Sequence, residues 1–125
     1  NKKIIVLFMM SKNSIIKVIL VGHVGQNPDL NYTTSGHSIA TFSLATNEVW
    51  FDADKKKKEH TEWHNIVAWN KLADFVKKYV VKGQLLYLEG RIHSQTWVDK
   101  NNIRQNRKEI ICDNITPLEW KSKDE

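Results

Sequence analysis

The alternation of apolar and polar positions predicts β-strands along most of the chain. In residues 39–48, Ala40, Phe42, Leu44 and Thr46 occupy every second position, so they would share the buried face of one strand. Five segments have the apolar or β-branched composition of strands: residues 15–24, 39–48, 61–70, 84–97 and 108–115. Two segments, 26–29 and 32–36, have the composition of turns or loops.

One segment has helical periodicity. Its apolar residues recur at intervals of three and four positions, which places them in a single stripe: Leu72, Phe75, Val76, Tyr79 and Val80. Asn70 is the predicted N-cap, and Gly83 is the predicted stop after the helix.

Five strands with one helix between the third and fourth form the layout of the OB-fold, a Greek-key β-barrel that binds oligonucleotides on one face. We therefore predict an all-β fold of this kind for residues 14–118. Residues 119–125 would be a short charged remnant.

Residues 1–13 are predicted to be an extension outside the fold. They contain a short apolar run, and Met9 and Met10 directly precede a plausible polar start. The run is too short to span a bilayer, and no cleavage pattern follows it, so a targeting function is the weaker alternative.

Composition adds three constraints. With 125 residues, the chain has room for one core and so for one domain. The net charge is +5, and the excess of basic residues is concentrated between Lys71 and Lys108, which suggests a polyanionic partner. Cys112 is the only cysteine and lies in an apolar run, so it is predicted to be a core residue, without a disulfide or a cysteine-based zinc site.

The five tryptophans are the most informative residues. Trp63 and Trp69 lie on the same face of the predicted strand 61–70, among polar neighbours, where flat ligands could stack on them. The predicted stacking set is Trp50, Trp63, Trp69 and Trp97. The alternative is that these indoles are buried in the core or in an interface between subunits.

Basic residues near these tryptophans are candidates for phosphate contacts. They are Lys55, Lys56, Lys71, Arg91, Lys100 and Arg104. Stacking combined with phosphate contacts suits single-stranded nucleic acid, because the bases of a duplex already stack on one another.

The sequence provides no support for catalysis. It contains no phosphate-binding loop and no nucleophile elbow, and its carboxylates form no recognisable pair. His60 and His64 would lie about 13 Å apart on a strand, too far apart to share a metal ion. We therefore predict a non-enzymatic protein with no metal and no cofactor.

Four separated segments resemble the bacterial-type single-stranded DNA-binding protein (SSB) family, in its order and spacing. They are KVILVGHVGQNP (17–28), ATFSLATN (40–47), TEWH (61–64), and KG (82–83) with YLEG (87–90). The resemblance extends from about Ser14 to Leu118. The segment 99–108 departs from the family because it lacks the usual glycine of the turn, which leaves its shape open.

The resemblance implies an OB-fold that assembles as a homotetramer and binds single-stranded DNA without sequence preference, in a bacterial cytoplasm at the nucleoid or in an organelle of bacterial origin. The four tryptophans match the family's stacking positions. His64, Leu85 and Tyr87 match positions at its subunit interfaces.

The family normally ends in an acidic tip that recruits replication and repair proteins, and this tip is missing here, so such partners are not assumed. Membrane association is not expected. The first rival function is that of an OB-fold protein-contact subunit of a replication-restart complex, which should have lost the aromatic set. The others are an RNA-binding module of the cold-shock kind and an OB-type enzyme domain.

Overall fold

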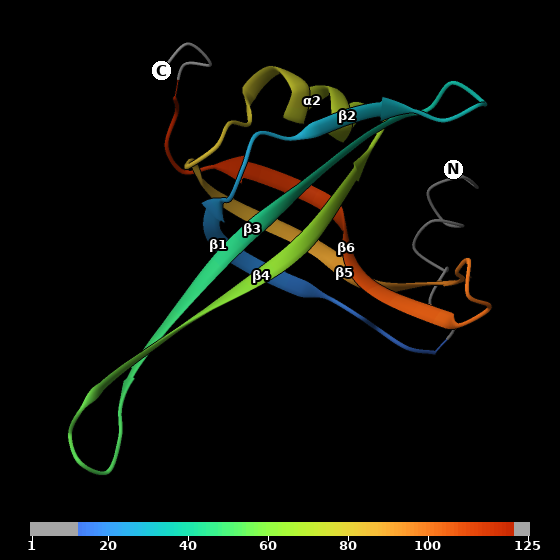
Figure 1. Ribbon diagram of the computed structural model, residues 1–125. Helices are drawn as coiled ribbons and strands as arrows, with labels where there is room; N and C mark the ends of the chain where they lie inside the picture. Colours follow the sequence, from blue (N-terminus) through green and yellow to red (C-terminus); the bar gives the residue numbers. More distant parts are fainter. Residues whose placement is uncertain (1–12, 122–125) are drawn as a thin grey trace.

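The computed structural model describes residues 13–121 (Figure 1). The predicted extension, apart from Asn13, and the last four residues of the predicted remnant lie outside this range. The described part contains one helix and six strands, in the order β1 (Val18–Val24), β2 (Asp29–Tyr32), β3 (Ser38–Phe51), β4 (Lys57–Trp69), α2 (Lys71–Tyr79), β5 (Leu85–Val98) and β6 (Arg104–Pro117).

The strands form a closed barrel. Their order in the sheet is β1-β5-β6-β4-β3-β2, and an additional pairing between β1 and β3 closes the ring of five strands. Among the strands of residues 13–121, only β4 and β6 pair in parallel, through Ile66 with Ile110 and Val67 with Ile111. Gly22 lies where β1 crosses β3, and a Cβ atom there would collide with the carbonyl oxygen of Ala45. The absence of a side chain at this position allows the barrel to close.

Two features of the predicted strand order need correction. The prediction missed β2. It assigned Asp29 to a turn and Tyr32 to a loop, because all four residues of β2 are exposed and show no alternation of burial. With β2 counted, the helix lies between β4 and β5, rather than between strands 3 and 4. In addition, β1 begins at Val18 and not at Ile15, which is exposed.

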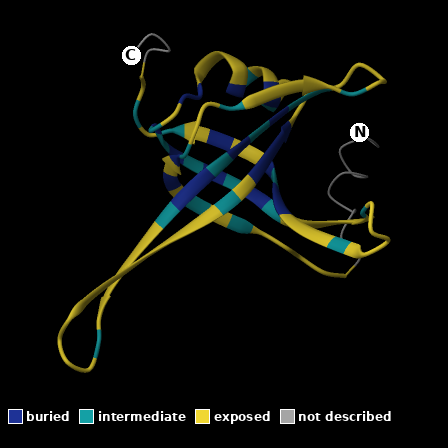
Figure 2. Cartoon of the chain, in the orientation of Figure 1, coloured by how far each residue is buried: buried dark blue, intermediate teal, exposed yellow. Residues whose placement is uncertain are grey.

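The core contains the apolar residues that the alternation predicted, whereas Thr46, also predicted on the buried face, is only half-buried. Ala40, Phe42 and Leu44 of β3 are buried, as are Ile66 and Ala68 of β4. Val76 of α2 is fully buried in the same cluster, so the apolar stripe of the helix covers one end of the barrel (Figure 2). Cys112 is also buried, as predicted.

Asn70 is the N-cap position of α2, as predicted, but it does not cap the helix through its side chain, and the helix ends before the predicted stop. Asn70 makes no side-chain hydrogen bond to the helix and has a positive φ of 53°. Its Oδ1 lies 3.1 Å from Nδ1 of His37, so the side chain bonds to the loop before β3 instead. The helix ends at Tyr79 with Val80 as its C-cap, and Gly83 lies in the turn that leads into β5.

Two hairpins extend beyond the barrel as arms. β3 and β4 stay paired from Ile39–Trp69 to Phe51–Lys57, and the outer part of this hairpin is exposed and projects away from the barrel (Figures 1 and 2). The hairpin of β5 and β6 forms the second arm.

The turns at the two tips are alike. Asp52 Oδ1 accepts hydrogen bonds from the backbone N–H groups of Asp54 and Lys56, both at 2.9 Å. Asp99 does the same for Asn101 and Ile103, and Asn102 takes the positive φ of 62° that a glycine would otherwise provide. The turn therefore forms without the glycine that is usual in the family.

Candidate nucleic-acid interface

Three tryptophans share the outer face of the sheet. On β4, Ile66 and Ala68 point into the barrel, so Trp63 and Trp69 lie on the outer face. That face continues onto β6 through the pair Val67–Ile111 and onto β5 through the pair Ile111–Arg91. Three further alternations along β5 lead from Arg91 to Trp97, which therefore lies on the same face.

The indole of Trp63 lies across β3. Its partner on β3 is the small residue Ala45, and a Cβ atom at Gly25 would collide with the six-membered ring of the Trp63 indole and with the Ser43 hydroxyl. A backbone hydrogen bond of 2.9 Å from Gly25 N–H to Ser43 C=O holds the end of β1 in this position. One side of the indole is therefore supported by protein, while the residue as a whole remains exposed.

Trp50 lies on the opposite face of the β3–β4 arm. Its partner across the hairpin is Lys58, and alternation places it on the side of Leu44 and Phe42, which continues the interior face of the barrel. The relative exposures are 58% for Trp63, 40% for Trp69, 46% for Trp97 and 46% for Trp50. Each of the four is thus accessible in the single chain, but only three share one face.

The basic residues predicted to contact phosphates are spread over both arms, α2 and β5. Lys55 and Lys56 lie exposed at the tip of the β3–β4 arm, and Lys100 lies at the tip of the other arm. Lys71 follows Trp69 at the start of α2, and Arg91 is half-buried on the outer face of β5. Arg104 pairs with Val98, so it lies on the face opposite Trp97.

Sequence reasoning missed Arg107. It pairs with Gln95 on the outer face, whereas Trp97 pairs with Gln105, so Arg107 and Trp97 are diagonal neighbours. Such neighbours are about 7–8 Å apart in an antiparallel sheet. The alternation of side chains along the strand could have placed Arg107 on the face of Trp97, but the sequence prediction began this strand only at Lys108, whereas β6 begins at Arg104.

The predicted interface residues form two separate groups. His64 is half-buried on the inner side of β4, with its Nε2 2.9 Å from Thr46 Oγ1. Leu85 and Tyr87 lie on the outer face of β5, where they pair with His23 and Val21 of β1.

The Tyr87 hydroxyl donates a hydrogen bond of 2.7 Å to Glu89 Oε2, and Glu89 also forms an ion pair of 3.3 Å with Lys17. These two partners, the hydroxyl first, lower the pKa of Glu89 from its usual range. The hydrogen bond to Glu89 in turn raises the pKa of Tyr87. A charged group therefore lies next to the exposed apolar residues Ile19 and Val21 on this surface.

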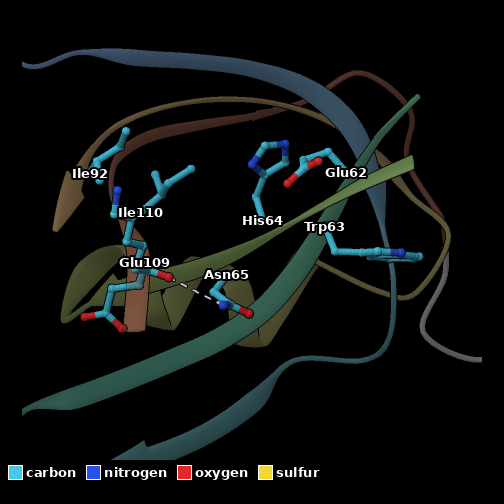
Figure 3. Close-up of a pocket in the computed structure, with 8 residues that line it drawn as sticks. Glu62, Trp63, His64, Asn65, Ile92, Glu109 and Ile110 are labelled. Atoms are coloured by element: carbon cyan, nitrogen blue, oxygen red, sulfur yellow. Dashed lines mark hydrogen bonds between the residues drawn. The ribbon is translucent and has the colours of Figure 1, made fainter. Parts of the chain in front are cut away.

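A cleft of about 240 Å³ opens beside His64, where β4 and β6 separate (Figure 3). Figure 3 shows the His64 side chain turned toward Ile92 and Ile110, whereas the Trp63 indole extends away from them. Asn65 Nδ2 donates a long hydrogen bond of 3.5 Å to Lys108 C=O at the edge of the cleft.

Further ionisable side chains among the described residues have shifted pKa values. His60 Nε2 pairs with Glu62 Oε2 at 2.8 Å, and this hydrogen bond lowers the pKa of Glu62. No group of three His, Cys, Asp or Glu residues in the range 13–121 could hold a metal ion. Burial raises the pKa of the Cys112 thiol to about 12, which leaves it unreactive at neutral pH. Among the residues described, no helix is long and apolar enough to cross a membrane.

Comparisons with known proteins agree on one family. The model of the single-strand binding protein family matches residues 15–118. Single-stranded DNA-binding protein 1 of Chlorobaculum tepidum is 43% identical over 103 residues, which cover 82% of this chain and 64% of that protein. The single-stranded DNA-binding protein of Bacteroides thetaiotaomicron is 45% identical over 107 residues, covering 84% of this chain and 66% of that protein.

Solved structures give the same result. A Plasmodium falciparum SSB in complex with ssDNA has a TM-score of 0.80 and 36% identity, over 88% of this chain and all of that one. A deletion mutant of the single-stranded DNA binding protein from Thermus aquaticus has a TM-score of 0.75 and 26% identity, over 84% of this chain and 51% of that one. The chain spans just under two thirds of the length of the curated relatives it matches. On the match of the family model over residues 15–118, the chain belongs to the single-strand binding protein family.

Proposed function

We propose that this protein binds single-stranded DNA without sequence preference and without catalysis, by stacking bases on tryptophan and contacting phosphates with basic side chains. The observation that carries the proposal is the outer face shared by Trp63, Trp69 and Trp97. Indoles that are accessible in the single chain do not belong to its core. Of the alternatives to stacking, only burial in an interface between subunits therefore remains. Stacking on an aromatic ring tolerates any base, because every base has a π-face.

The relatives support this proposal. Their names describe single-stranded DNA binding, and the structure from Plasmodium falciparum is a complex with ssDNA. The barrel of this chain resembles that protein over its whole length, and we infer the same Greek-key OB arrangement here. In the cell, the protein would protect and organise single strands during replication, recombination and repair. We place it in a bacterial cytoplasm at the nucleoid, with an organelle of bacterial origin as the alternative.

We also propose a homotetramer. The outer face of β1 and β5 presents Ile19 and Val21, which are exposed, beside Leu85 and Tyr87. Burying such apolar surface between subunits is favourable. His64 would serve a second contact, because it lies on the inner side of β4, away from this patch.

The rival functions have less support. A protein-contact subunit that had given up DNA binding should lack exposed stacking residues, and this chain keeps four such tryptophans. A cold-shock type RNA module would cluster its aromatics on adjacent strands. Here the outer-face tryptophans lie on β4 and β5, which β6 separates.

Tryptophan fluorescence tests the proposal. The protein is titrated with oligo(dT), duplex DNA and single-stranded RNA at low and high salt. We expect deep quenching by oligo(dT), little by the duplex, and weaker binding at high salt because phosphate contacts release counterions. A folded protein that shows no quenching with oligo(dT) would contradict the proposal and would favour burial of the indoles in a subunit interface.

A further inference from the structure

A small polar hollow lies on the outer face of the sheet, next to Trp63. It has a volume of about 120 Å³ and opens between the segment after β1, the strands β3 and β4, and β6. We call this site the outer hollow. Its polar lining residues are Gln26, Asp29, Thr41, Ser43, Asn65 and Arg107. No part of the predicted DNA site includes any of them.

The outer hollow begins where the Trp63 indole ends. A Cβ atom added at Gly25 would collide with both the Ser43 hydroxyl and the Trp63 ring. Ser43, which lines the hollow, therefore lies next to the indole on the surface. Asn65, which also lines it, is two residues from Trp63 on the same face of β4. A nucleotide that follows a base stacked on Trp63 therefore meets this hollow.

Arg107 connects the hollow to the second arm. It lines the hollow and is also the diagonal neighbour of Trp97 on the outer face. A strand that stacks on both Trp63 and Trp97 must therefore pass Arg107. A guanidinium group binds phosphate oxygens through two parallel hydrogen bonds, which suits it to hold the backbone between the two stacked bases.

The other lining groups favour a base over a phosphate inside the hollow. The Asp29 carboxylate would repel a phosphate, whereas a carboxylate accepts hydrogen bonds from the N–H groups of bases. Gln26, Ser43 and Asn65 each carry both donors and acceptors, so together they can bond to the edges of different bases. Asn65 Nδ2 donates one of its hydrogen bonds, of 3.5 Å, to Lys108 C=O, which leaves Oδ1 and the second N–H for a base.

We propose that the outer hollow seats one nucleobase of the bound single strand, and that Arg107 holds the adjoining phosphate on its way toward Trp97. This inference rests on the proposed single-stranded DNA binding and adds a subsite to it.

Two variants test the two roles separately. Arg107→Gln removes the charge, and Asn65→Leu removes hydrogen bonding at similar volume; both residues are exposed, so the fold should be kept, which circular dichroism checks. Lys78→Gln, on the exposed side of α2, is the matched control for loss of one positive charge. Affinity for oligo(dT) is measured across a range of salt concentrations.

We expect Arg107→Gln to weaken binding about tenfold at low salt. It should also reduce the slope of log K against log [salt] by about 0.7, the value for one phosphate contact on a single strand. We expect Asn65→Leu to weaken binding several-fold with an unchanged slope, and Lys78→Gln to change neither.

An Arg107→Gln protein that keeps the slope of the unmodified protein would overturn the phosphate contact, and unchanged affinity of Asn65→Leu would overturn the base subsite. In both results the unmodified protein still binds oligo(dT). If the proposed function itself is wrong, the unmodified protein does not bind oligo(dT) at all, so the two failures can be told apart.

Discussion

The six-membered ring of Trp63 lies against the Gly25 backbone, so closely that no side chain fits on Gly25. Gly25 directly follows β1 and Trp63 lies on β4, and these strands are not neighbours in the sheet, because β3 lies between them. The indole crosses β3 above Ala45, its small partner. The glycine therefore determines the position of a predicted stacking residue, as well as the course of the chain after β1.

The first prediction concerns this contact. Gly25→Ala should destabilise the fold by about 1–3 kcal/mol, as overpacking does, and should weaken oligo(dT) binding by displacing the indole. In a Trp63→Ala background the same substitution should cost at least about 0.5 kcal/mol less, because one of its two close contacts, that with the indole, is gone. Thermal unfolding of the four proteins of this cycle measures the coupling. Equal costs in both backgrounds would show that the strain comes from Ser43 or the backbone alone.

The second prediction concerns the stacking residues themselves. Trp63→Ala and Trp97→Ala should each weaken single-strand binding by about 1–3 kcal/mol, the value of one stacked base. Both tryptophans are about half exposed and lie outside the core, so the fold should survive each substitution. Fluorescence anisotropy of labelled oligo(dT) gives the affinity, and circular dichroism checks the fold. An unfolded Trp63→Ala or Trp97→Ala protein would mean that the tryptophan is needed in the core.

Much of this site could be predicted from the sequence, because strand alternation is a short-range property. The period of two placed Trp63 and Trp69 on the face opposite Ile66 and Ala68, and the structure confirms this. It also identified the core positions of β3.

Other features depend on pairing between distant strands, which alternation along one strand does not reveal. The register of the β3–β4 hairpin places Trp50 on the face opposite Trp63, although both are exposed tryptophans of the same hairpin. Arg107 of β6 lines the same hollow as Asn65 of β4 because these two strands pair in parallel. β2 escaped prediction because none of its residues is buried.

The third prediction concerns pH and the outer face of β1 and β5. The pKa of Glu89 is lowered from 4.5 by its hydrogen bond from Tyr87 and by Lys17, so the unfolded chain binds a proton there more readily than the folded one. Glu89 therefore contributes stability above pH 4.5 that is lost as the pH falls through its lowered pKa.

Urea unfolding between pH 3 and pH 6 tests this contribution. Glu89→Gln should flatten the loss of stability on the acid side. Glu59→Gln is the matched control, because Glu59 pairs with Lys57 on the exposed arm without a tyrosine donor. If the two variants show the same acid dependence, the Tyr87 hydrogen bond does not contribute.

The fourth prediction concerns His64 and assembly. If His64 takes part in a subunit contact, as we propose, His64→Ala should shift the protein toward smaller species at low concentration. The same substitution also removes the 2.9 Å contact with Thr46, which could act through the fold of one chain alone. Thr46→Val separates the two effects, because it removes this internal contact and leaves the imidazole in place. Sedimentation velocity across a dilution series should show dissociation for His64→Ala and a smaller change for Thr46→Val. Equal dissociation of both variants would assign the effect to the internal contact, and an unchanged mass for His64→Ala would remove His64 from the interface.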